Sequence, residues 1–117
     1  MPEQHAIELP ADPSLGATVR IWVGESGRTL GLGESVVQDL RLVASELLAN
    51  GVATGSERLG LELTGSDGTW ELVARGVGPL GDGALGGLPI SRLDLLRGLG
   101  TVRIDPDGVV RCSGSSD

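Results

Sequence analysis

The segment from about Glu34 to Val52 places the strongest constraint on the fold. Its apolar residues recur at helical spacing and form a wide stripe, made of Val36, Val37, Leu40, Val43, Ala44, Leu47, Leu48 and Gly51. A stripe with this period is typical of an amphipathic helix that buries one face. We therefore expect a helix of about five turns, packed against a second layer of the protein.

Two polar residues accompany this stripe. Glu46 and Asn50 are four residues apart, so a helix places them one turn apart on the same flank. We expect the pair at the rim of the core-facing surface, where polar side chains can face a cleft. The residues by themselves favour a solvated flank, in which Asn50 merely ends the helix beside Gly51.

The rest of the chain alternates between strand and helix signals. Ser14 is a candidate N-cap for a first helix near residues 14–26. The other expected elements are an edge strand at Ile7–Leu9, a hairpin from Arg58–Thr64 and Thr69–Ala74, a helix at Ser91–Leu99, and a hairpin from Thr101–Asp105 and Gly108–Cys112. This order favours an α+β two-layer sandwich, with a mixed or antiparallel sheet and helices on one face. We expect one domain over residues 1–112 and a disordered tail over residues 113–117.

The composition narrows the classes of function. The net charge is -7, and the chain has neither Phe nor Tyr, which argues against nucleic acid and anionic membranes as partners. One cysteine, Cys112, and one histidine, His5, exclude an internal disulfide and weaken any zinc site or histidine-based triad. No apolar run is long enough to span a bilayer, and the first residues lack the pattern of a signal peptide. A cytoplasmic protein is the expectation.

The stretch VVQDLRLVASELLANGV, followed by a hairpin and a glycine pair, resembles the N-box region of the GHKL superfamily, the histidine-kinase-like ATPases. The closest resemblance is to the small bacterial anti-sigma-factor serine kinases, and it extends from about Ile7 to Cys112. It implies the histidine-kinase-like ATPase fold with ATP and Mg²⁺ as cofactors. If the resemblance holds, it implies that Asn50 holds the metal ion and that Glu46 acts as the catalytic base.

The other nucleotide boxes of the family are altered here. The glycines of the second box are present as Gly76 and Gly78, although both also fit ordinary turn positions, and the acid that would contact adenine is replaced by Ala74. The third box aligns with Ile90-Ser91-Arg92-Leu93, where two glycines are replaced by larger residues. Arg92 could still meet a phosphate through its guanidinium. The resemblance thus implies cofactor binding by Asn50, Gly76, Gly78 and Arg92 that is weakened or lost.

Three functions follow as alternatives. The first is a regulatory protein that binds a sigma factor or an anti-anti-sigma-like regulator, with impaired ATP binding. The second is an active ATP-dependent protein serine kinase, and the third is a structural or dimerisation module without a ligand. Trp22, in the first expected helix, either anchors a homodimer interface or packs inside one subunit.

Overall fold

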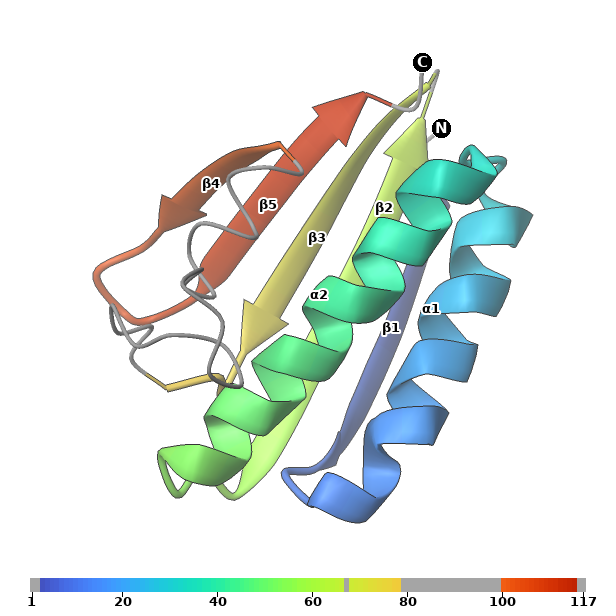
Figure 1. The fold of residues 1–117 in the computed structure, drawn as a ribbon. Coiled ribbons are helices and arrows are strands. Elements are labelled where there is room, and N and C mark those ends of the chain that lie inside the picture. The colour runs from blue at the N-terminus through green and yellow to red at the C-terminus, as the bar shows by residue number, and fades with distance from the viewer. Residues whose placement is uncertain (1–2, 67, 79–99, 116–117) are drawn as a thin grey trace, which may run out of the picture.

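The computed structural model of the protein describes residues 3–66, 68–78 and 100–115. Its elements follow in the order β1 (Glu3–Pro10), the short 3-10 helix η1 (Pro13–Leu15), α1 (Gly16–Thr29), α2 (Glu34–Ala53), β2 (Arg58–Ser66), β3 (Thr69–Arg75), β4 (Thr101–Ile104) and β5 (Val110–Ser115). The described strands form one five-stranded sheet in the order β1-β2-β3-β5-β4, and every neighbouring pair is antiparallel. The two helices lie side by side on one face of this sheet (Figure 1). The expected two-layer α+β architecture is therefore confirmed.

The core lies between the helices and the leucine-rich faces of β2 and β3. Alternate residues of β2 point to the helices because side chains on a strand alternate between its faces, and these residues are Leu59, Leu61 and Leu63. The register places Leu63 opposite Leu72 of β3, which continues the same apolar row. From the other layer, α2 contributes the predicted stripe, with Leu40, Val43, Leu47 and Leu48 all buried. The apolar face predicted for the helix therefore packs against the apolar face predicted for the strands.

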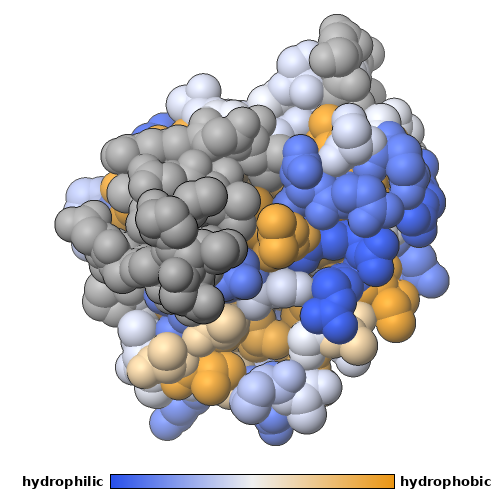
Figure 2. Space-filling view, in the orientation of Figure 1, coloured by the Kyte–Doolittle hydropathy of each residue, from blue (hydrophilic) through white to orange (hydrophobic). Residues whose placement is uncertain are grey.

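Close packing between the two helices depends on a small residue. Gly27 of α1 lies against Val37 of α2, so that a Cβ at position 27 would come within 2.9 Å of the Val37 Cγ2. Gly31, with φ of 78°, then turns the chain towards α2. The surface over the helices is mainly hydrophilic, with scattered hydrophobic spots (Figure 2). Ile21 of α1 and Leu42 of α2 are exposed hydrophobic residues.

Several expected boundaries are corrected. Ser14 is not the N-cap of α1: that position is Leu15, which makes no side-chain capping bond. Asp12 caps η1, and its side chain accepts a hydrogen bond from the Ser14 amide. The helix α1 runs to Thr29, because its last turn packs on α2 where a loop was expected. The prediction of a disordered tail over residues 113–117 is wrong for residues 113–115, which belong to β5 and pair with β3. The expected edge strand and both hairpins are confirmed, whereas the expected helix at Ser91–Leu99 lies outside the described residues.

Trp22 is half-buried and packs against the core of its own subunit. Part of the Trp22 side chain therefore packs inside one subunit, as the second alternative predicts. The rest of the side chain is exposed, and its place in a homodimer interface stays a prediction.

Leu47→Ala should destabilise the protein by about 2–5 kcal/mol, because it opens a cavity in a well-packed core. Leu47 is 1% exposed, whereas Leu42 on the same helix is 50% exposed. Leu42→Ala, the matched control, should change the free energy of unfolding by no more than about 0.5 kcal/mol. Urea denaturation followed by circular dichroism measures both. Equal losses in the two variants would contradict the assigned orientation of α2.

Candidate functional site

The two polar residues predicted on α2 occupy different environments. Glu46 is half-buried, as expected at the rim, but Asn50 is only 5% exposed. The Asn50 side-chain amide, Nδ2, donates a hydrogen bond of 2.5 Å to the carbonyl oxygen of Val77. The expectation of a rim position is therefore wrong for Asn50, because the chain that leaves β3 covers this end of the helix.

That covering segment is a turn with two residues in the left-handed region. Gly76 and Gly78 have φ angles of 76° and 74°, and Val77 between them is buried. A Cβ at Gly76 would lie 2.0 Å from the Arg58 carbonyl oxygen, and one at Gly78 would lie 2.0 Å from the Thr54 Oγ1. Both glycines are thus required by close packing against the chain itself.

Thr54 completes the contact between α2 and this turn. Its hydroxyl donates to the Asn50 carbonyl oxygen at 2.9 Å and lies 3.5 Å from the Val77 carbonyl oxygen. Next to it, a Cβ at Gly51 would come within 3.0 Å of the Gly76 carbonyl oxygen. Sequence reasoning missed Thr54 and Val77. A threonine at a helix end gives a weak signal, and a backbone carbonyl gives none.

The position expected to read adenine is apolar in the structure. Ala74 is fully buried on the helix-facing side of β3, between Leu61 of β2 and Val110 of β5. Its methyl group cannot accept a hydrogen bond from a base. Arg92 and the rest of the third box lie outside the described residues, so their predicted role is untested.

A hollow of about 510 Å³ opens beside Gly78, at the β4–β5 turn. Its walls include Ile104, Asp105 and Val110. The Asp105 carboxylate accepts hydrogen bonds of 2.9 Å from the Nε atoms of Arg111 and Arg103, and this pairing lowers the pKa of Asp105. The carboxylate is therefore ionised and committed to structural partners.

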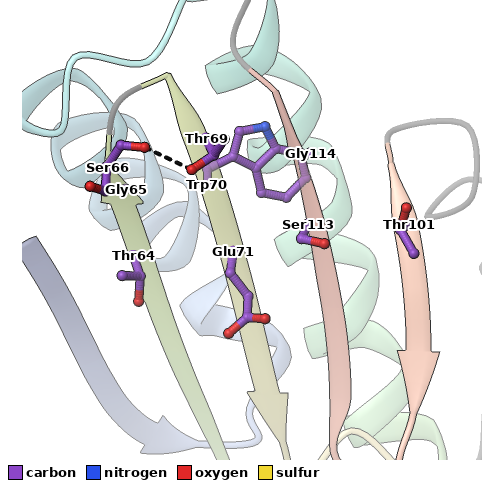
Figure 3. A pocket seen from close by; sticks show the side chains of 9 residues that line it. All are labelled: Thr64, Gly65, Ser66, Thr69, Trp70, Glu71, Thr101, Ser113 and Gly114. Atoms are coloured by element: carbon purple, nitrogen blue, oxygen red, sulfur yellow. Dashed lines mark hydrogen bonds between the residues drawn. The ribbon is translucent and has the colours of Figure 1, made fainter. Parts of the chain in front are cut away.

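A second hollow, of about 410 Å³, lies on the face of the sheet that points away from the helices. Figure 3 shows its lining from β2, β3, β5 and the first residue of β4. The side chains are mostly short hydroxyls around one carboxylate, and the lining residues are Thr64, Gly65, Ser66, Thr69, Trp70, Glu71, Thr101, Ser113 and Gly114. The Thr69 hydroxyl donates to the Ser66 carbonyl oxygen at 2.7 Å. A serine or threonine nucleophile needs an adjacent base. The lining contains neither histidine nor lysine, and its one carboxylate, Glu71, lies 3.8 Å from the Arg111 guanidinium.

The remaining reactive side chains offer little chemistry. Cys112 is buried on β5, and burial raises the pKa of its thiol to about 11, so the thiol is neutral near pH 7. His5 lies on the edge strand β1. Within the described ranges, no group of three or more histidine, cysteine, aspartate or glutamate side chains could hold a metal ion. In the same part of the chain, no helix is long and apolar enough to cross a membrane.

No protein-family model matches the chain, and no curated protein is significantly similar to it.

The described residues fit ATP and Mg²⁺ poorly. Gly76 and Gly78 pack against Arg58 and Thr54, so they do not form an open cradle for phosphates. Ala74 offers no hydrogen-bond acceptor to a base. What the arrangement does provide is a closely packed junction between the end of α2, the start of β2 and the exit from β3.

Gly76→Ala should cost roughly 2–5 kcal/mol, the sum of a strained left-handed backbone and a steric overlap with the Arg58 carbonyl. Gly31 is the matched control, because its φ is 78° but no heavy atom lies within 4 Å of an added Cβ. Gly31→Ala should cost only the backbone term, about 1–2 kcal/mol. Chemical denaturation of both variants separates the two terms. A Gly76→Ala variant no less stable than Gly31→Ala would show that the turn is loosely packed.

Asp105→Asn should make stability less sensitive to acid. The pKa of Asp105 is lowered in the folded state, so its pairing stabilises the protein above the unfolded pKa of about 3.9. That stabilisation is lost as the pH falls through the folded pKa of Asp105. An asparagine does not titrate, so the variant has no such pH-dependent contribution. The free energy of unfolding measured between pH 6 and pH 3 should therefore fall less steeply in the variant. Glu57→Gln, at an exposed position outside the Asp105 cluster, serves as the control.

Proposed function

We propose that this chain is a regulatory protein with a histidine-kinase-like ATPase fold of the anti-sigma-factor type, acting by binding another protein. In this proposal nucleotide binding is weakened or lost. A sigma factor or an anti-anti-sigma-like regulator is the proposed partner, a homodimer is a further proposed assembly, and the cytoplasm is the proposed location. The support comes from the order of elements, in which a hairpin and a glycine turn follow a helix that carries Glu46 and Asn50.

The observation that carries the loss of nucleotide binding is the burial of Ala74. This residue is fully enclosed between neighbouring strands, where a family member would present a carboxylate to adenine. A buried donor on the base would be left without its acceptor, at a cost of about 1–3 kcal/mol. The bond from Asn50 to Val77 engages only the side-chain amide nitrogen, whereas a metal ion would be bound by the carboxamide oxygen, so this contact does not bear on metal binding.

An active ATP-dependent serine kinase is the second candidate. It is favoured by the retained spacing of Glu46 and Asn50, and by the half-buried position of Glu46, which leaves part of its side chain accessible. In such an enzyme Glu46 would orient or deprotonate the hydroxyl of a substrate serine. Adenine would then have to be recognised without a carboxylate at position 74.

Isothermal titration with Mg-ATP distinguishes the two candidates. We expect no saturable heat in the micromolar range, and no rise in melting temperature when Mg-ATP is added. A ligand present at a hundred times its Kd would add about 2.7 kcal/mol of stability, which a melting curve detects easily. Tight, magnesium-dependent binding, with a Kd in the low micromolar range, would favour the kinase and reject the loss of nucleotide binding.

Ala74→Asp serves as the second arm of this experiment. A carboxylate at this buried position should lower the stability, since nothing in the apolar row of Leu61 and Val110 can pair with it. It should not produce tight Mg-ATP binding, because the glycine turn remains packed against Thr54 and Arg58. Restoration of tight binding by this single change would show that only the base contact was missing.

A further inference from the structure

The strand β1 lies at one edge of the sheet and carries the free backbone of that edge. Among the described strands, β2 is its only partner, and the register is one-to-one from Glu3 to Pro10. A one-to-one register contains no bulge that would twist the edge away from an incoming strand. The strand also contains no lysine, a residue that often protects exposed edges. Figure 1 shows β1 as the outermost strand, on the side of the sheet that α1 covers.

The backbone groups that point outward can be assigned from the residue after β1. The Ala11 amide donates to the Glu57 carbonyl oxygen at 3.0 Å, and this bond continues the β1–β2 ladder beyond Pro10. In an antiparallel pair, residues bonded to the partner strand alternate with residues whose N–H and C=O groups point away. Pro10, which has no N–H to donate, therefore occupies an outward position. The other residues with outward backbone groups are Gln4, Ala6 and Glu8.

An apolar side chain of α1 lies beside this edge. The helix packs on α2 through Gly24 and Gly27, and it faces the sheet with the buried Val23. At about 100° per residue, Trp22 falls on the flank of α1 that points away from α2, towards the free edge. Trp22 is half-buried, and so is Ile7, which faces the helices from β1. A strand added to β1 would therefore gain an apolar contact with Trp22 as well as backbone hydrogen bonds.

The end of β1 carries more acid than base. Glu8 and Asp12 are exposed, and Arg58 pairs with Glu8 at 2.5 Å. Asp12 accepts hydrogen bonds from Ser14, which lower the pKa of Asp12 and keep its carboxylate ionised near neutral pH. The pair of Glu8 and Arg58 is neutral, so the charge of Asp12 leaves this end of the edge negative.

The helix α1 adds to this negative charge. Glu25 is exposed and lies one turn beyond Trp22. It attracts Arg28, but the Arg28 guanidinium is hydrogen-bonded to Glu34, so one cation is shared by two carboxylates. The net charge of the whole chain is -7. A second copy of the chain would bring like charge to this edge, whereas a basic segment would be attracted to it.

We propose that the free edge of β1 binds an extended basic segment of another protein by strand addition. The segment exchanges backbone hydrogen bonds with Gln4, Ala6 and Glu8. Because side chains alternate along a strand, its basic residues lie on the outer face of the sheet beside Glu8, and its apolar residues lie on the helix side beside Trp22. This inference rests on the proposed function in one respect, that the chain acts by binding another protein.

The test uses the complete ¹⁵N-labelled chain and a blocked peptide of the length of β1, in which arginine and valine alternate. The backbone amides of Ala6 and Glu8 should shift, reach saturation and become protected from hydrogen exchange, because they gain acceptors. The amide of Ile7, which is already bonded to β2, should gain little protection. Val102 and Ile104 on β4, at the opposite edge, are the internal control and should not respond.

Variants at Ala6 test the backbone and the charge separately. Ala6→Pro removes the central outward N–H and should weaken peptide binding about tenfold, as expected for one or two lost hydrogen bonds. The fold should be kept, since this N–H makes no bond to β2. Ala6→Lys and Ala6→Glu are a matched pair at one exposed position: lysine should weaken and glutamate should strengthen binding, each roughly threefold. Circular dichroism confirms that each variant is folded.

The proposal is wrong if Ala6 and Glu8 do not respond, if the opposite edge responds equally, or if the folded lysine and glutamate variants bind the peptide with the same affinity. Sedimentation of the peptide-free chain tests the second copy. A dimer that Ala6→Pro dissociates would assign the edge to a homodimer instead and overturn the proposal. These outcomes are separate from the Mg-ATP titration, in which tight binding would reject the loss of nucleotide binding and leave the peptide result unchanged.

Discussion

Burial of the leucine face of α2 against β2 and β3 is the interaction on which the rest of the structure depends. Leu40 and Leu47 of the helix, and Leu61, Leu63 and Leu72 of the strands, are almost completely removed from water. Each fully buried side chain of this kind contributes about 1.5–3 kcal/mol. Both α1 and the turn at Gly76–Gly78 pack directly against this helix, so their positions depend on its being fixed on the sheet.

The junction at the end of α2 shows how a polar group can become part of a core. Asn50 lies one turn from Glu46, but its amide is bound to the Val77 backbone and shielded from solvent. A buried carbonyl needs a donor, and an asparagine at this position provides one. Replacement of the donor would leave the Val77 carbonyl oxygen with only the long contact of 3.5 Å from the Thr54 hydroxyl. The residue thus has a structural reason to be present, whatever ligand chemistry it performs.

Much of this fold could be predicted from the sequence, because the two periodicities are strong. The α2 stripe and the alternation of Leu59, Leu61 and Leu63 identify a helix and a strand with one buried face each. Boundaries were harder. A short 3-10 helix capped by Asp12 precedes α1, so that Ser14 is not the cap of α1. The strand β5 continues through Ser113 and Gly114 because β3 offers backbone partners, which a local pattern of small polar residues does not reveal.

The candidate site was less predictable, for a physical reason. The spacing of Glu46 and Asn50 fixes their relative positions on a helix, but the burial of Asn50 depends on a segment 27 residues further along the chain. No local pattern encodes the approach of the Val77 carbonyl. Positive φ angles at Gly76 and Gly78 agree with glycine, yet the sequence does not tell whether the space beside a glycine holds a ligand or the chain's own atoms.

The register of the sheet also has a consequence for the order of folding. β1 pairs with β2 along its whole length, from Glu3 opposite Gly65 to Pro10 opposite Arg58. In the sequence, both helices lie in the segment that connects these two paired strands. Closing so long a loop is entropically costly and slows folding. The β2–β3 hairpin and the α1–α2 pair consist of local contacts and can form early. β1 can then pair with β2 last among these elements, after the helices have packed on the sheet.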